Sequence, residues 1–336
     1  MYDAFLLLSF GGPEGPDDVM PFLRNVTAGR GVPDARLAEV AEHYQHFGGV
    51  SPINQQCRDL LDAVRVEFDG HGIDLPVYWG NRNWDPYLAD TLARMRDDGV
   101  RHALALATSA FGSYSSCRQY LEDIVAARAK VGPGAPAVDK LRQFYDHPGF
   151  VEPHADALRS ALATLPAGET RVVFTAHSVP VAMNRAAGPT GDRYTDQLTE
   201  LAELVAARAG AAVPHQLVWQ SRSGPPQVPW LEPDINDHLE SLAKQGVANV
   251  AVSPIGFVSD HVEVRWDLDN EAAETAKRLG LGYARAATPG TDPRFVAMVR
   301  ELVTERLDPA APRRRLGTLP VWDTCAEGCC ALPPRR

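Results

Sequence analysis

Residues 4–10 read AFLLLSF and are followed at once by GGP at residues 11–13. A short, almost continuously apolar run that ends in glycine and proline is typical of a strand buried on both faces of a parallel sheet. The same pattern recurs along the chain on both sides of Pro148. The further runs lie at 76–80, 103–107, 171–176, 215–220 and 249–254.

Stretches with helical periodicity separate these runs, among them 86–99, 156–165 and 195–209. Strands that alternate with helices predict a doubly wound α/β fold. Because the series restarts after Pro148, we expect two similar lobes and a terminal extension. Ligands of open α/β sheets bind beyond the carboxyl ends of the strands, so a cleft between the lobes is the expected site. The expected parts are residues 1–147, 148–308 and 309–336.

The composition narrows the class of function. The chain has 336 residues, 45% of them hydrophobic and 23% charged, which is ordinary for a globular protein. A net charge of −10 argues against a nucleic-acid partner, since such proteins carry a basic face. No run approaches the roughly 18 apolar residues of a membrane span, and the start lacks the basic segment of a signal peptide. We therefore expect no transmembrane segment and a cytoplasmic location.

Several cofactor motifs are missing from the sequence. There is no Gly-x-x-x-x-Gly-Lys-Ser/Thr loop for ATP, and GGPEG at residues 11–15 is not Gly-x-Gly-x-x-Gly. The proline in that segment also spoils the turn that would hold a phosphate. No Gly-x-Ser-x-Gly segment occurs either. These observations predict a protein that uses no nucleotide and is not a familiar serine hydrolase.

Three carboxylates, Glu263, Asp267 and Glu271, repeat at steps of four. On a helix this spacing stacks them along one face, with a drift of about 40° per step. Such a row repels itself, which favours a compensating cation. Two interpretations stay open at this point: a path for a cation, or a solvated acidic face.

His177 follows the apolar run at 171–176 directly. It can be a histidine satisfied by a backbone carbonyl, or a neutral imidazole that binds a metal or accepts a proton. Glu263 also follows a predicted strand and turn, so the two side chains are expected to face each other across the cleft. A histidine and a carboxylate with open positions suit a divalent, iron-like ion that is handled transiently.

Six motifs, which occur in family order from residue 6 to about 271, resemble the ferrochelatase family. The resemblance implies insertion of ferrous iron into a porphyrin with release of two protons and without a nucleotide. It also implies two Rossmann-like, chelatase-type lobes with the porphyrin between them. The motifs are LLLSFGGP at 6–13, GGVSPIN at 48–54, FTAHSVP at 174–180, QSRSGP at 220–225, PWLEP at 229–233 and FVSDHVE at 257–263.

The resemblance implies specific roles for the residues singled out above. His177 matches the family's metal-binding histidine and acceptor of pyrrole protons, and Glu263 matches the carboxylate opposite it. Asp267 and Glu271 match the acidic row that leads iron inward. In this family the row lies on a helix with a π-type turn, whose extra residues per turn offset the α-helical drift.

Further residues are expected at the porphyrin. By the same resemblance, Ser51 and Tyr120 match positions that contact the propionates. Many family members have a tyrosine where this chain has Phe10. A phenylalanine cannot bind iron, so we expect Phe10 to pack against the macrocycle instead.

Three of the five cysteines, Cys325, Cys329 and Cys330, lie within six residues of each other. Structural disulfides are rare in the cytoplasm, so the alternatives are a flexible tail, a zinc site or an iron–sulfur cluster. A fourth ligand would be Cys117 or Cys57. Actinobacterial ferrochelatases, which this chain resembles, hold a [2Fe-2S] cluster with three C-terminal cysteines and an internal one. That resemblance implies Cys117 as the fourth ligand.

The actinobacterial resemblance also implies coproporphyrin III as the porphyrin and coproheme as the product. Four basic or polar side chains are spread over residues 22–50: Arg24, Arg30, Arg36 and His43. They favour a polar entrance to the cleft, which fits coproporphyrin III with its four negative charges. The alternatives are a protoporphyrin IX ferrochelatase, a cobalt or nickel tetrapyrrole chelatase, and a non-enzymatic haem or metal carrier. A transient contact with the next enzyme of the haem pathway is a further expectation.

Overall fold

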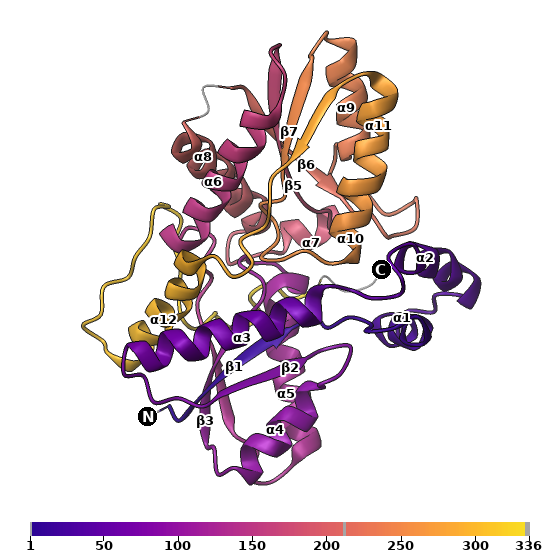
Figure 1. Cartoon of the computed structure of the whole chain (residues 1–336). Helices are drawn as coiled ribbons and strands as arrows, with labels where there is room; N and C mark the ends of the chain where they lie inside the picture. Colours follow the sequence, from indigo (N-terminus) through magenta and orange to yellow (C-terminus); the bar gives the residue numbers. More distant parts are fainter. Residues whose placement is uncertain (1, 211–212, 333–336) are drawn as a thin grey trace.

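Two parallel sheets form the centre of the computed structural model, which describes residues 2–210 and 213–332 (Figure 1). The first sheet has the order β2-β1-β3-β4 and the second β6-β5-β7-β8, and all six neighbouring pairs are parallel. The predicted two-lobed α/β fold is therefore confirmed. The strands are β1 (Ala4–Ser9), β2 (Val77–Asn81), β3 (His102–Ala107), β4 (Ala137–Lys140), β5 (Thr170–His177), β6 (His215–Gln220), β7 (Asn249–Ser253) and β8 (Gly282–Arg285).

Helices cover both sheets, and two segments have π-helical geometry. The α-helices are α1 (Val19–Val26), α2 (Asp34–His46), α3 (Ile53–Gly70), α4 (Leu88–Asp97), α5 (Gln119–Val131), α6 (Pro148–Thr164), α7 (Val181–Arg185), α8 (Arg193–Ala209), α9 (Ile235–Lys244), α10 (Val262–Val264), α11 (Ala273–Leu279) and α12 (Pro293–Leu307). A 3₁₀ turn, η1 (Pro16–Asp18), and the π segments η2 (Tyr114–Arg118) and η3 (Arg265–Ala272) complete the described elements.

The apolar runs form the strands because their side chains are buried on both sheet faces. All six residues of β1 are buried, and Phe5 meets Phe68 of α3 with ring centroids 5.4 Å apart. The sequence did not mark β4 and β8, whose residues are all half-buried at sheet edges. An edge strand needs no continuous apolar run, which is why the pattern missed both.

α12 joins the two halves of the chain. It packs against α6 of the second half and α3 of the first (Figure 1). Arg300 Nε on α12 lies 2.7 Å from Glu67 Oε1 on α3. The domain bounds stay a prediction. α12, which those bounds assign to the second lobe, also contacts the first lobe.

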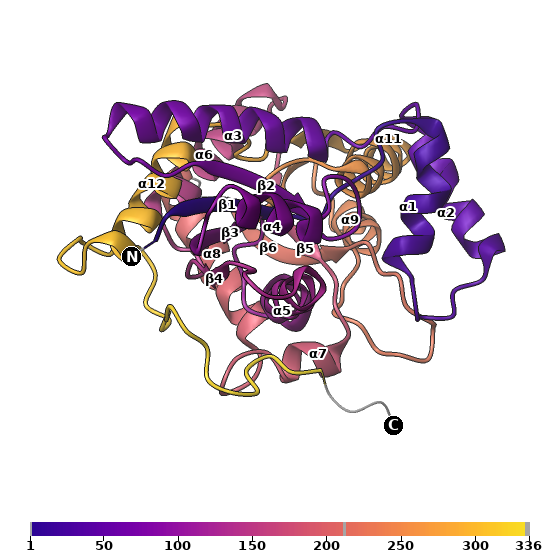
Figure 2. The ribbon, with the colours of Figure 1, turned by 90° about the horizontal axis from the view of Figure 1, so that it is seen from below.

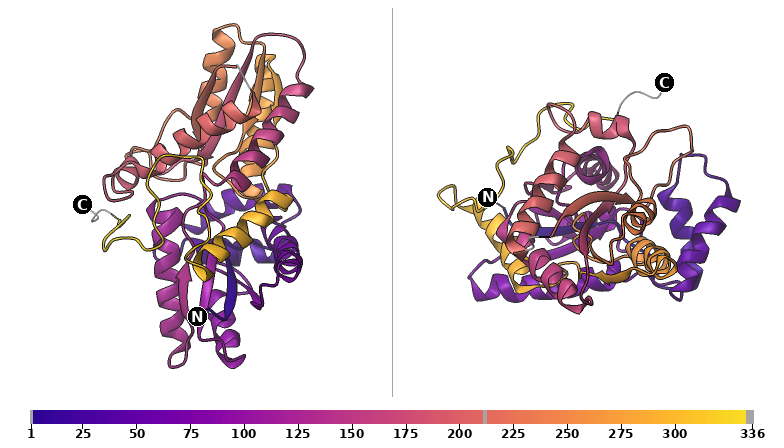
Figure 3. Two further views of the ribbon diagram at one scale, coloured as in Figure 1. Left: turned by 90° about the vertical axis from the view of Figure 1, so that its left-hand side faces the viewer. Right: turned by 90° about the horizontal axis from the view of Figure 1, so that it is seen from above.

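The tail after α12 lies against the body of the protein. Figures 2 and 3 show it in yellow, running from α12 along one side and reaching the neighbourhood of α7 in Figure 2. Arg315 Nε donates to Asp146 Oδ2 at 2.7 Å, and the Thr318 amide donates to Glu200 Oε1 at 2.6 Å. Across residues 2–210 and 213–332, no helix combines the length and apolar content required to cross a membrane.

The buried ion pair of Arg142 and Glu305 generates a stability prediction. Its side chains are 1% and 2% exposed, and two N–H groups of Arg142 donate to Glu305 at 2.7 and 2.8 Å. Arg142→Met leaves the Glu305 charge buried without this partner, so we expect the free energy of unfolding to fall by about 3–5 kcal/mol. Chemical denaturation measures it. Arg159→Met, at an exposed pair with Asp156, is the control and should change little. Equal losses in both variants would contradict the prediction.

Candidate active site

His177 is the last residue of β5, and its two ring nitrogens have different environments. Nδ1 lies 2.5 Å from the Ser178 carbonyl oxygen, which can only accept a hydrogen bond. In the neutral ring the proton is therefore on Nδ1, and the lone pair is on Nε2. One nitrogen is therefore satisfied by a backbone carbonyl, while metal binding or proton acceptance by the other stays a prediction.

Glu263 faces that free nitrogen. Its neighbours Val262 and Val264 are buried, which leaves the Glu263 side chain 48% exposed at the start of the helix. Glu263 Oε2 lies 3.8 Å from His177 Nε2, beyond hydrogen-bond distance. Two donors that each bind one ion at about 2.1 Å are at most about 4.2 Å apart, so this pair can share an ion. The structure brings the predicted pair together.

Asp267 and Glu271 lie on the π segment η3, as the resemblance implied, whereas Glu263 lies on α10 just before it. η3 begins at Arg265, and its residues Leu268 and Ala272 are buried against the second sheet. Glu263 and Glu271 are exposed, whereas Asp267 is half-buried. The three carboxylates therefore differ in their exposure to solvent and do not form one uniform exposed face.

Asp267 turns toward the end of β6. Ser221 Oγ donates to Asp267 Oδ2, and Gln220 Nε2 donates to the same oxygen at 3.2 Å. Burial raises the pKa of Asp267 to about 7, and the charges of Glu263 and Glu271 act in the same direction. The hydrogen bonds from Ser221 and Gln220 oppose this rise. Asp267 consequently changes its charge near neutral pH.

Trp266 and His43 border the outer part of the row. Trp266 Nε1 donates to Glu271 Oε1 at 2.9 Å. The His43 ring, from α2 of the first lobe, stacks on Trp266 with a centroid distance of 4.0 Å and an interplanar angle of 9°. Burial lowers the pKa of His43, which favours the neutral form of this ring. The row is thus bordered by both lobes; α2 lies close to α10 in Figure 1.

Three residues near the row were not predicted as site residues: Ser221, Trp266 and His43. Ser221 lies in the QSRSGP motif and Trp266 inside the acidic segment, so both carried a local signal. His43 was expected only as part of a polar entrance, and its stacking on Trp266 was not predictable because it joins positions more than two hundred residues apart.

The predicted porphyrin contacts Phe10, Ser51 and Tyr120 lie in the first lobe. Ser51 is buried against Gly12, where an added Cβ would be 2.7 Å from the Ser51 Cβ. Tyr120 is 4% exposed, and the Arg82 guanidinium carbon lies 4.8 Å from its ring centroid and 5.6 Å from that of Phe10. The cation of Arg82 thus lies near both rings. The expected contacts of all three residues with the porphyrin stay predictions.

The tail brings its cysteines to Cys117, on the π segment η2. The neighbouring Cys325 thiol lowers the pKa of Cys117 well below its usual range. Cys329 Sγ lies 3.7 Å from Cys330 Sγ, and the Gly188 amide donates to Cys330 Sγ at 3.1 Å. Cys57 instead lies in a large hydrophobic core to which both lobes and α12 contribute. Within the described residues, no group of three or more His, Cys, Asp or Glu side chains is placed to hold a metal ion.

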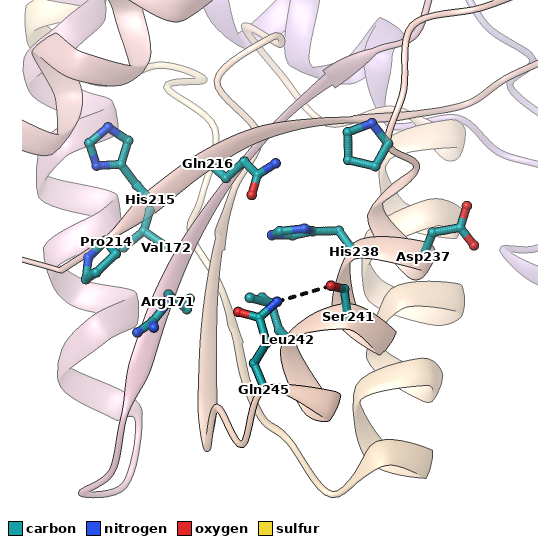
Figure 4. A pocket seen from close by; sticks show the side chains of 11 residues that line it. Arg171, Val172, Pro214, His215, Gln216, Asp237, His238, Ser241, Leu242 and Gln245 are labelled. Carbon is teal, nitrogen blue, oxygen red and sulfur yellow. Dashed lines mark hydrogen bonds between the residues drawn. The ribbon is translucent and has the colours of Figure 1, made fainter.

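A separate hollow of about 370 Å³ lies at the opposite end of the second sheet (Figure 4). Arg171 and His215, at the starts of β5 and β6, line it together with His238 and Ser241 of α9. His177 lies at the other end of β5. None of the predicted site residues belongs to this hollow.

Comparisons with known proteins place the chain in a family. The family model described as Ferrochelatase matches residues 2–307. The chain is 62% identical to a coproporphyrin III ferrochelatase of Nocardia farcinica, over 99% of this chain and 97% of the relative. It is 58% identical to a protein of the same name from Mycolicibacterium smegmatis, over 95% and 94%. SirB from Bacillus subtilis shares the fold, with a TM-score of 0.53, 14% identity and coverage of 91% and 98%. The chain belongs to the ferrochelatase family.

Proposed function

We propose that this protein inserts ferrous iron into coproporphyrin III, giving coproheme and releasing two protons. The observation that carries the proposal is the free Nε2 of His177, 3.8 Å from Glu263 Oε2. It pairs a nitrogen base with a carboxylate, the groups that iron binding and proton removal require. The choice of coproporphyrin III follows the names of the two relatives from Nocardia farcinica and Mycolicibacterium smegmatis.

In the proposed reaction, iron loses its hydration water in steps along the acidic row. Glu271 and Asp267 supply oxygen ligands on the way, and Glu263 receives the ion next to the porphyrin. His177 Nε2 then accepts a proton from a pyrrole nitrogen and passes it to solvent, and the second pyrrole proton leaves in the same way. The Ser178 carbonyl keeps the proton of the neutral ring on Nδ1, so Nε2 stays available for each turnover.

We also propose that Cys117, Cys325, Cys329 and Cys330 hold a [2Fe-2S] cluster. Two sulfurs on one tetrahedral metal, each about 2.3 Å from it, lie about 3.8 Å apart. The 3.7 Å between Cys329 Sγ and Cys330 Sγ suits such a pair, and Cys117 and Cys325 form a second pair. In a binuclear cluster each iron needs only two protein sulfurs, whereas a zinc site needs four ligands at one ion. When bound, the cluster supplies a redox centre and ties the tail to the first lobe.

Other expectations stay predictions. They are the porphyrin contacts of Phe10, Ser51 and Tyr120, the cytoplasmic location, and a transient contact with the next enzyme of the haem pathway.

The substrate is tested by the rate of ferrous iron insertion, followed by the visible spectrum of the porphyrin. We expect faster insertion into coproporphyrin III than into protoporphyrin IX. Preference for protoporphyrin IX, or for cobalt or nickel over iron in competition, would contradict the proposal in favour of the corresponding chelatase. Tight retention of the metalloporphyrin with no insertion would indicate a carrier.

His177→Ala and Glu263→Ala are each expected to lower the insertion rate at least a hundredfold, because each removes a group that contacts the reacting atoms. Binding of coproporphyrin III, measured by fluorescence quenching, should persist. Glu274→Ala removes an exposed carboxylate of α11, one turn beyond Glu271, and is the matched control. Insertion at the wild-type rate by either active-site variant would refute the assigned roles.

The cluster is tested by the colour of the protein as purified without added metal. We expect a brown preparation with visible absorbance and about two iron atoms per chain. Cys117→Ser should lose this absorbance, while Cys57→Ala, which alters a buried cysteine outside the proposed cluster, should keep it. A colourless native protein that contains zinc would contradict the cluster.

A further inference from the structure

Ser221 has an uncommon backbone conformation at the end of β6. Its φ is 61°, in the left-handed region that residues other than glycine rarely adopt. Such a conformation costs free energy and persists where the surroundings hold it, often at functional sites. Here it accompanies a hydrogen bond from the Ser221 hydroxyl to Asp267.

Gln220 supplies a second donor to the same carboxylate oxygen. The residue is 1% exposed, and its Nε2 donates to Asp267 Oδ2 at 3.2 Å. Its Oε1 is buried and has no hydrogen-bond partner in the described part of the chain. Buried acceptors without a hydrogen-bond partner are rare in folded proteins, so the unpaired Gln220 Oε1 needs an explanation. Keeping the amide nitrogen directed at Asp267 provides one.

The place of Gln220 connects Asp267 with His177. Gln220, the last residue of β6, is paired with His177, the last residue of β5, and the Ser178 amide donates to the Gln220 carbonyl at 2.8 Å. Asp267 is therefore held against the strand that neighbours the histidine. An unpaired carboxylate pays a desolvation cost at this half-buried position, so without these donors it would favour an outward orientation.

We propose that Ser221 and Gln220 are positioning residues for iron delivery, which hold Asp267 turned inward so that an ion on the acidic row is passed toward Glu263 and His177. This inference rests on the proposed function.

Ser221→Gly is the first test, since glycine adopts a positive φ without strain and removes the side chain together with its hydroxyl. We expect the KM for ferrous iron to rise about tenfold, the size of a lost hydrogen bond to a charged group. The KM for coproporphyrin III and the melting temperature should stay at wild-type values. Ser221→Ala should raise the iron KM equally. Ser223→Ala, at an exposed serine of the same loop, is the matched control and should change neither KM.

A double-mutant cycle with Asp267→Asn identifies the group on which Ser221 acts. In the Asp267→Asn background, Ser221→Gly should change the iron KM less than twofold. An iron KM unchanged in both single Ser221 variants, or a full tenfold rise in the Asn background, would overturn the inference. If the wild-type protein still inserts iron, these results on the variants overturn only the inference and leave the proposed function intact. A wild-type protein that inserts no iron would refute the proposed function itself.

Discussion

β5 lies between β6 and β7 and pairs with both in the parallel sense, and this pairing determines where the site forms. Parallel strands end at the same edge, so the segments that leave them emerge side by side. His177 ends β5, Ser221 follows β6, and the chain beyond β7 returns to the Thr175 carbonyl through the Gly256 amide at 3.0 Å. The contacts of Asp267 with the end of β6 and of Glu263 with the end of β5 both depend on this common edge.

π-helical geometry appears at both places where the chain gathers candidate ligands. η2 carries Cys117 and η3 carries Asp267. A π segment adds a residue to a helical turn and rotates the following side chains, so it can bring a chosen residue inward while the helix keeps its buried face. In η3 the buried face includes Leu268, and the residue directed toward β6 is Asp267. The same rotation leaves Glu271 exposed, at Trp266.

The fold was predictable from the sequence because it depends on local patterns. The strand ends and the family resemblance led to the pair of His177 and Glu263, whose roles stay predictions. Apolar runs marked six of the eight described strands, and His177 was found as the residue that ends one of them. β4 was missed because half-buried edge residues need no apolar run. The inward turn of Asp267 was not predictable, since a spacing of four says nothing about a donor that arrives from β6. The meeting of Cys117 with the tail followed from family resemblance alone, because no local pattern records a contact over two hundred residues.

The difference between the three carboxylates bears on how an ion would move along them. Three fully charged groups would bind a divalent ion strongly at every step, and strong binding slows release to the next ligand. Burial gives Asp267 a pKa of about 7, so the middle group carries its full charge only part of the time at neutral pH. An approaching cation favours the charged form, and departure of the cation restores the proton. Because an ion must displace this proton, the apparent affinity of Asp267 for a cation is lower than that of a fully ionised carboxylate, which would suit the proposed transfer of iron better than its storage.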